Sequence, residues 1–185
     1  HQELTLALMD GRTYLDEEPP QYLADMENPY DFNQREYLLV RHKYQPEYRW
    51  DYAYYNCIYY IYFGILPVIF IYLQVYALTG IMLRTDLVVG MLSLLLIGAS
   101  FWLVWEIFKR WFRTSSYVLY PLLSTALFFG TGVTVLLRNP AVYETCIIMG
   151  LLCVMAGLAS WIRAGQGEKL KIHYLFLGSL LIAST

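Results

Sequence analysis

Glu144 is the acidic residue whose surroundings most suggest chemistry, because it stands inside an apolar run beside Val142, Tyr143 and Cys146. A carboxylate at membrane depth is costly to place, and where one occurs it commonly binds an ion or relays a proton. Arg138 stands six residues earlier and offers a structural alternative, since an acid in the first turn of a helix is also stabilised by the helix dipole. The sequence leaves two interpretations open: a proton or ion site at Glu144, and an intramembrane ion pair of Arg138 with Glu144.

A second carboxylate, Glu106, stands at the start of the basic aromatic segment EIFKRWFR. Lys109 and Arg110 follow it at three and four residues, the spacing at which helical side chains face each other. We therefore predict a local ion pair near the end of a helix.

The histidines and cysteines form no pattern typical of a cofactor site. A haem held by two histidines needs both at membrane depth, and of His1, His42 and His173 only the last stands in an apolar segment. The three cysteines are odd in number and have no CxxC spacing, which argues against a disulfide framework and a zinc site. No catalytic triad, zinc-protease motif or phosphate loop is present. We expect no catalytic residue, no metal and no cofactor, other than a bound phospholipid such as cardiolipin.

Long apolar segments must hold these groups. Residues 52–83 carry no charge, and the runs 87–105, 114–137 and 145–162 follow. A bilayer core about 30 Å thick needs about 20 apolar residues to be crossed by a helix, so four segments reach the length and a fifth approaches it. The sequence predicts an all-α integral membrane protein with four to five transmembrane helices. Their expected bounds are about 53–83, 87–105, 117–137, 140–162 and 172–185.

The first 51 residues differ from the rest, with eleven acidic against five basic residues and four prolines. We predict an extended N-terminal arm outside the membrane over residues 1–51, followed by a transmembrane helical bundle over residues 52–185. The acidic balance excludes nucleic acid as a partner, which requires clustered Lys and Arg. The arm is rich in aromatic residues, which favours docking on a partner over disorder.

Aromatic residues indicate where helices meet the membrane surface, since Tyr and Trp concentrate at that level. A stripe of tyrosines on the first helix and a group of tryptophans at the end of the second fit this role. The expected interface aromatics are Tyr52, Tyr55, Tyr59, Tyr62, Trp102, Trp105 and Trp111. Pro67 predicts a kink in the first helix near residues 63–64.

Small residues predict where helices pack, because they let two backbones approach closely. The expected packing positions are Gly90, Gly98, Gly150, Cys153, Gly157 and Ser160. Their partners could belong to this chain or to another subunit.

Basic residues set the expected orientation, because Lys and Arg accumulate on the inner side of a membrane. With a span over residues 53–83, nine basic residues fall on the side of the N-terminus and two on the other. The nine are Arg41, Lys43, Arg49, Lys109, Arg110, Arg113, Arg163, Lys169 and Lys171, against Arg84 and Arg138. If His1 is the end left by a cleaved organellar presequence, this predicts the mitochondrial inner membrane with the N-terminus in the matrix. Another organellar membrane or the ER membrane is the alternative.

In general pattern the sequence resembles supernumerary subunits of large energy-converting assemblies of inner membranes. The shared features are an aromatic arm on the inner side, short loops and several helices. The resemblance implies a non-catalytic accessory or structural subunit of a large multi-subunit membrane complex, of respiratory-chain or ATP-synthase type. Its partners would be other membrane subunits and the lipid bilayer. The alternative is a small transporter or proton-conducting protein that uses Glu144.

Overall fold

The computed structural model describes residues 1–41, 49, 51–112, 114 and 117–185. Two compact units divide the chain, His1–Met82 and Leu83–Thr185. The described residues are mostly helical, with one two-stranded sheet among them. The mostly helical fold agrees with the sequence prediction, but the division between units falls at residue 82 and not at residue 51.

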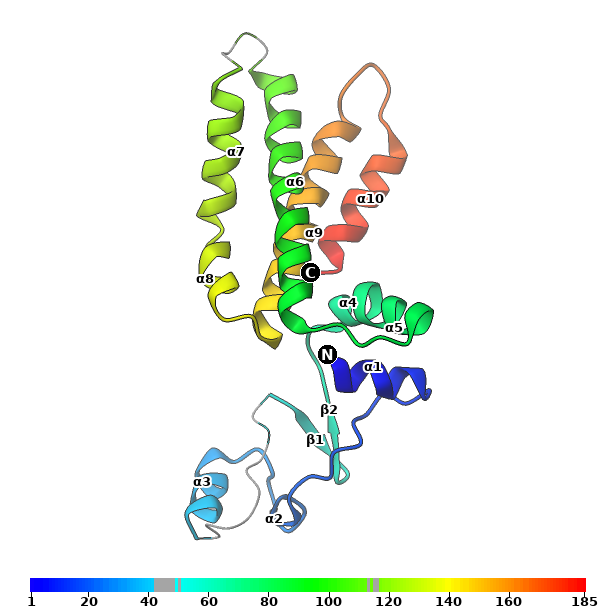
Figure 1. The fold of residues 1–185 in the computed structure, drawn as a ribbon, viewed down its shortest axis with the longest axis vertical. Coiled ribbons are helices and arrows are strands. Elements are labelled where there is room, and N and C mark those ends of the chain that lie inside the picture. Colours follow the sequence, from blue (N-terminus) through cyan, green and yellow to red (C-terminus); the bar gives the residue numbers. More distant parts are fainter. Residues whose placement is uncertain (42–48, 50, 113, 115–116) are drawn as a thin grey trace. The chain divides into compact units, whose positions relative to one another are not determined.

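The N-terminal unit contains short helices and a β-hairpin (Figure 1). Its first elements are α1 (Gln2–Met9), α2 (Gln21–Ala24), α3 (Phe32–Arg41), β1 (Ala53–Tyr55) and β2 (Ile58–Tyr60). The strands are antiparallel, and Ala53 pairs with Tyr60. Asn56 and Cys57 form the two-residue turn with φ of 50° and 59°, the left-handed conformation that tight hairpins require.

A core around Tyr59 packs the first residues of the chain against this hairpin. Tyr59 is 1 % exposed, and the rings of Tyr52 and Tyr54 meet it edge-on. The Tyr52 hydroxyl donates to Glu3 Oε2 at 3.0 Å, and burial together with the Glu3 charge raises the pKa of Tyr52 to about 12. Leu23 joins the same core. The described part of residues 1–51 is therefore packed into this unit and is not an extended arm.

The predicted membrane helix over residues 53–83 is wrong. Residues 53–60 form the hairpin, and the helical stretch comprises only α4 (Ile65–Pro67), the π-helical η1 (Val68–Tyr72) and α5 (Leu73–Thr79). This stretch of fifteen residues is about 22 Å long, too short to cross a bilayer core by itself. Pro67 lies in the first turn after Gly64, where its missing N–H costs nothing, so it stands at the start of a helix and not inside the predicted one.

The predicted stripe of tyrosines on one helical face is wrong as well, because residues 53–55 and 58–60 form strands. Aromatic and β-branched residues favour strands, and in a strand neighbouring side chains alternate between two faces. Tyr59 is buried, Tyr52 is partly buried, and Tyr55 and Tyr62 are exposed. The four residues therefore do not share a helical face.

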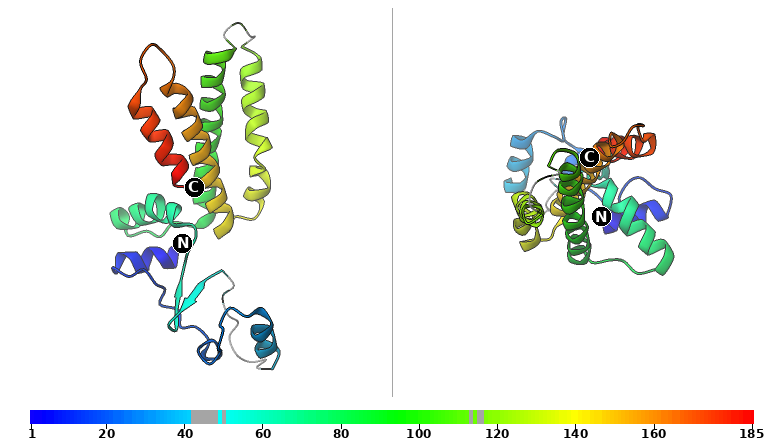
Figure 2. Two further views of the ribbon diagram at one scale, coloured as in Figure 1. Left: turned by 180° about the vertical axis from the view of Figure 1, so that it is seen from behind. Right: turned by 90° about the horizontal axis from the view of Figure 1, so that it is seen from above.

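The C-terminal unit is a helical bundle around two long helices (Figures 1 and 2). Its elements are α6 (Thr85–Trp111), α7 (Leu119–Gly130), α8 (Val133–Arg138), α9 (Val142–Ala164) and α10 (Ile172–Ala183). Among the described residues, α6 and α9 are the two helices long and apolar enough to cross a membrane. By length and composition they favour a membrane protein, but the described residues contain two such helices and not the predicted four or five.

The contacts between helices give their directions. Ser100 on α6 donates to Met155 Sδ on α9, and Glu106 on α6 meets Arg163 on α9, so these two helices run parallel. Tyr120 at the start of α7 donates to the Phe101 carbonyl in the second half of α6, and α7 returns antiparallel to α6 (Figure 1). The returning segment breaks between α7 and α8 at Gly132, whose φ is 74°. The predicted helix over residues 117–137 is thus two shorter helices.

α9 and α10 meet at a close contact between two glycines. A Cβ on Gly178 would lie 2.7 Å from the Gly157 carbonyl oxygen, and one on Gly157 would lie 2.6 Å from Ile182 Cγ1. Cys153 and Ser160, also expected at packing positions, are buried on the same helix. The structure therefore places part of the predicted small-residue set against α10, with Gly178 as a partner that the sequence did not single out.

The remaining predicted glycines are not at contacts. A Cβ added to Gly90, Gly98 or Gly150 would meet nothing within 4 Å. These positions face open space within the described part of this unit.

We expect Gly178→Ala to destabilise the bundle by about 1–3 kcal/mol, because the new methyl group must push α10 away from the Gly157 backbone. Gly150→Ala is the matched control and should be neutral or stabilising by roughly 0.5–1 kcal/mol, the usual gain from removing a helical glycine. Thermal unfolding of the two variants in detergent would be compared with the original chain. Equal unfolding midpoints for the two variants would show that the contact does not exist.

Candidate functional site

Glu106 on α6 is fully buried, with 0 % of its side chain exposed. Arg163 Nη1 donates to Glu106 Oε1 at 2.7 Å, and Trp102 Nε1 donates to the same oxygen at 3.1 Å. The second carboxylate oxygen, Oε2, has no hydrogen-bond partner in the described part of the chain. One arginine on α9 is therefore the main compensation for a carboxylate that the fold has removed from water.

Arg163 extends this link to a third helix. Its guanidinium lies over the ring of Tyr174 on α10, 5.1 Å from the centroid. The side chain is 35 % exposed, so the ion pair lies at the edge of the bundle and not at its centre. Three helices therefore meet around one pair of charges.

The predicted local pairing of Glu106 with Lys109 and Arg110 is wrong. Both cations are exposed on α6, whereas Glu106 lies on the buried face toward α9. Lys109 Nζ lies over the Trp105 ring at 4.9 Å, and Arg110 Nη1 donates to the Gly165 carbonyl at 3.1 Å. Helical spacing favoured the two nearest cations as partners, but the partner of Glu106 is Arg163 on another helix.

The loop after α9 is held against α6 by side chains from both segments. Arg110 binds the Gly165 carbonyl, and Gln166 Nε2 donates to the Glu106 carbonyl at 3.1 Å. A Cβ on Gly165 would lie 2.7 Å from Arg110 Nη1, so a larger residue there would require the Arg110 side chain to move. Two hydrogen bonds in opposite directions thus set the distance between the loop and the helix.

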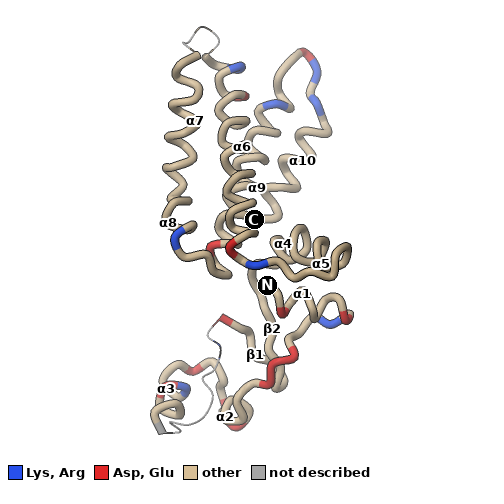
Figure 3. Tube along the Cα trace, viewed as in Figure 1, with Lys and Arg blue, Asp and Glu red and all other residues tan. Residues whose placement is uncertain are grey.

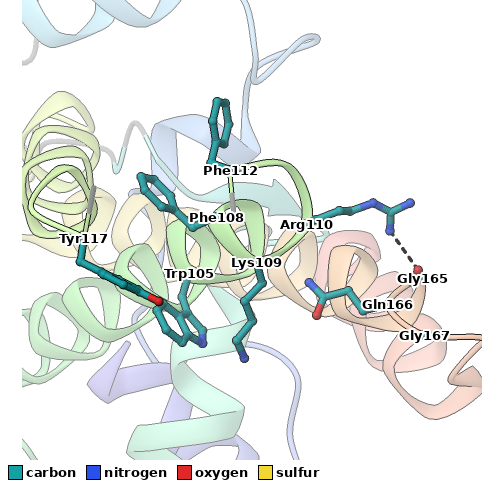
Figure 4. A pocket seen from close by; sticks show the side chains of 9 residues that line it. All are labelled: Trp105, Phe108, Lys109, Arg110, Phe112, Tyr117, Gly165, Gln166 and Gly167. Carbon is teal, nitrogen blue, oxygen red and sulfur yellow. Dashed lines mark hydrogen bonds between the residues drawn. The ribbon is translucent and has the colours of Figure 1, made fainter. Parts of the chain in front are cut away.

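A pocket of about 650 Å³ lies beside this contact (Figure 4). Aromatic rings, two cations and the glycine-containing loop line it. The lining residues are Trp105, Phe108, Lys109, Arg110, Phe112, Tyr117, Gly165, Gln166 and Gly167. In Figure 4 the Lys109 side chain lies between those of Trp105 and Gln166, while Arg110 reaches toward Gly165. Cations beside aromatic faces and an open backbone can bind an anion that also has an apolar part.

Charged residues of this unit gather at the two ends of the helices (Figure 3). The pocket end carries five basic and two acidic residues among those described. They are Lys109, Arg110, Arg163, Lys169 and Lys171, with Glu106 and Glu168. The other end carries Arg84 paired with Asp86 at 2.8 Å, together with Arg138 and Glu144. Of the residues considered from the sequence, His42, Lys43 and Arg113 lie outside the described ones.

The predicted ion pair of Arg138 with Glu144 is not formed within 4.0 Å in the described part of the chain. Arg138 ends α8 with an exposed side chain, and Glu144 lies in the first turn of α9 after an extended connection at Ala141. Glu144 Oε2 is buried and has no hydrogen-bond partner among the described residues. The turn between the two helices therefore separates the two groups.

Within the described residues, no cluster of three or more His, Cys, Asp or Glu is placed to hold a metal ion. Comparison with family models, with curated proteins and with solved structures finds no match for this chain.

We expect Glu106→Gln and Arg163→Gln each to destabilise the bundle by about 2 kcal/mol, because each leaves a buried polar or charged partner unpaired. The double variant should cost clearly less than the sum of the two, since the pair acts as a unit. Lys109→Gln is the control, because sequence spacing predicts Lys109 as the partner of Glu106, whereas in the structure Glu106 pairs with Arg163. Additive effects in a thermodynamic cycle, or an equal loss in Lys109→Gln, would contradict the α6–α9 pairing.

Proposed function

We propose that this chain is a non-catalytic accessory subunit of a large multi-subunit membrane complex, held in the bilayer by the bundle of residues 83–185. The two long apolar helices support membrane insertion. Because α6 and α9 run parallel, a chain that crosses the membrane in both must also return across it. The returning segment is α7–α8, which covers residues 119–138 and breaks at Gly132. A broken helix at membrane depth is tolerated where other protein surrounds it.

The observation that carries the proposal is the exposed apolar face of α10. This helix has twelve residues and is about 18 Å long, well short of a bilayer core. One face packs on α9 through Gly178, while Phe176 and Leu180 are 70 % and 56 % exposed. A short apolar helix with one unpartnered face fits beside the membrane helices of another subunit better than in lipid alone.

The N-terminal unit offers a second kind of contact surface. Several of its aromatic side chains are more than half exposed although the unit has its own core. They are Tyr30, Phe32, Tyr37, Tyr55, Tyr62 and Phe70. Aromatic residues of this kind are the usual anchors of protein interfaces. They would bind extramembrane segments of partner subunits.

The orientation proposed from the sequence needs revision, because the span over residues 53–83 is missing. With α6 as the first span, the pocket end carries the basic residues and would face the inner side. The rule counts only cations close to a span, and Arg49 stands 35 residues before Arg84. Residues 1–82 would then lie on the outer side with Arg84 and Arg138. In the mitochondrial inner membrane, the setting suggested by the resemblance to respiratory-chain and ATP-synthase subunits, the pocket end would face the matrix.

A second candidate, a small transporter or proton-conducting protein, is favoured by Glu144. Its buried Oε2 lacks a hydrogen-bond partner in the described part of the chain, as expected of a group that exchanges a proton or binds an ion. The exposed apolar face of α10 has no role in a transporter of this kind. We therefore rank the transporter second.

We expect the tagged chain, extracted from its native membrane in mild detergent, to migrate on native gels in a particle far larger than its own 21.6 kDa. Mass spectrometry of that particle should identify other membrane subunits. Phe176→Ala with Leu180→Ala should weaken the association on the order of thirtyfold, the effect of losing interface anchors worth about 2 kcal/mol. Lys169→Gln, an exposed substitution in the preceding loop, is the control.

A particle that contains this chain alone would contradict the accessory role. It would direct attention to Glu144 and to ion flux in reconstituted vesicles.

A further inference from the structure

Two adjacent cations border the pocket at the C-terminal end of α6. Lys109 and Arg110 are exposed, and both line the cavity. Arg110 forms no ion pair with a carboxylate in the described part of the chain, since its contacts are the Gly165 carbonyl and the Trp111 ring. The nearest carboxylate on the same helix, Glu106, is already bound to Arg163. Two basic side chains therefore stand at the rim of the pocket, and within the described residues the Arg110 charge is not paired with a carboxylate.

The apolar part of α6 ends at the level of this rim. The charge-free run of residues 87–105 ends at Trp105, and Lys109 stands one helical turn beyond it. Trp105 and Tyr117 line the pocket, and Trp111 is exposed beside it. Where a membrane helix leaves the apolar core, tryptophan and tyrosine come first and Lys and Arg follow at the level of the headgroups. If α6 spans the bilayer, the pocket opens at headgroup depth.

The walls of the pocket suit an amphiphilic ligand. Among the aromatic residues that line it, Phe108 is buried, whereas Phe112 and Tyr117 are exposed and extend the apolar lining to the outer surface. On the opposite side, Gly165 and Gly167 leave the loop backbone uncovered by side chains. An anionic group could thus lie at the cations while hydrocarbon chains follow the aromatic wall.

We propose that this pocket binds an anionic phospholipid, with the headgroup phosphate between Lys109 and Arg110 and the acyl chains along Phe112 and Tyr117. Inorganic phosphate shares the anionic chemistry but has no group to contact the aromatic wall. The lipid assignment rests on the membrane insertion of α6. It does not depend on membership of a complex, so it can be tested on the isolated chain.

The test is native mass spectrometry of the full chain in detergent, with phosphatidylglycerol and phosphatidylcholine of identical acyl chains added together. The original chain should prefer phosphatidylglycerol. Lys109→Gln with Arg110→Gln should lower this preference about thirtyfold, and Lys109→Gln alone about fivefold, as expected for the loss of two cations or one. The single variant keeps the bond from Arg110 to Gly165, so the test survives if the double variant fails to fold.

The matched control is Lys169→Gln with Lys171→Gln, which removes the same charge at the same end of the bundle from residues that do not line the pocket. It should leave the preference unchanged within about twofold. An equal loss in both double variants would overturn the proposal in favour of general surface charge, as would the absence of any preference in the original chain. Displacement of the bound lipid by millimolar inorganic phosphate would overturn the lipid assignment and identify a phosphate site.

Discussion

The arrangement of the C-terminal bundle depends on the burial of one carboxylate. Removing an ionised group from water costs several kcal/mol even after the protein relaxes, unless an opposite charge and hydrogen bonds compensate for it. Glu106 receives both from residues of two helices, Arg163 on α9 and Trp102 on its own helix. Such pairs often add little net stability compared with an apolar core, but breaking one is costly. Its main consequence here is the register of α6 against α9.

Several other features follow from that register. With Glu106 opposite Arg163, α6 and α9 run parallel, and the chain between them must return along the bundle. The loop just after Arg163 then lies against α6, because Gln166 donates to the Glu106 carbonyl and Arg110 donates to the Gly165 carbonyl. The same pair therefore positions the loop that forms one wall of the basic pocket. Further along, Gly157 and Gly178 allow α10 to lie directly on α9, which leaves the opposite face of α10 uncovered.

Long apolar runs were sufficient to predict α6, α9 and α10, with bounds within about six residues of those found. The Tyr-rich segment shows where such reasoning fails. Residues 52–64 carry no charge, as in a membrane helix, but their aromatic and β-branched side chains favour strands, and the left-handed turn at Asn56–Cys57 closes a hairpin. Gly132 likewise divides a continuous apolar run, because hydropathy does not report a backbone conformation.

The candidate site was predicted only in part for a related reason. Lys109, Arg110 and Trp105 were recognised as a basic aromatic group at a helix end, and the structure places them around one pocket. The partner of Glu106 was missed because sequence spacing favours the nearest cations, whereas Arg163 lies 57 residues away. Nothing in the local sequence distinguishes Arg163 from the other basic residues. Only the parallel packing of α6 and α9 brings it to the carboxylate.

The membrane crossing of the bundle is tested most directly by labelling single cysteines in sealed vesicles. Cys57, Cys146 and Cys153 would first be replaced, and one cysteine introduced at Asp86, Asn139 or Lys169. A membrane-impermeant maleimide should label positions 86 and 139 from one side, and position 169 only from the other. Labelling of positions 86 and 169 from the same side would contradict the account, because parallel α6 and α9 could not then both cross the membrane.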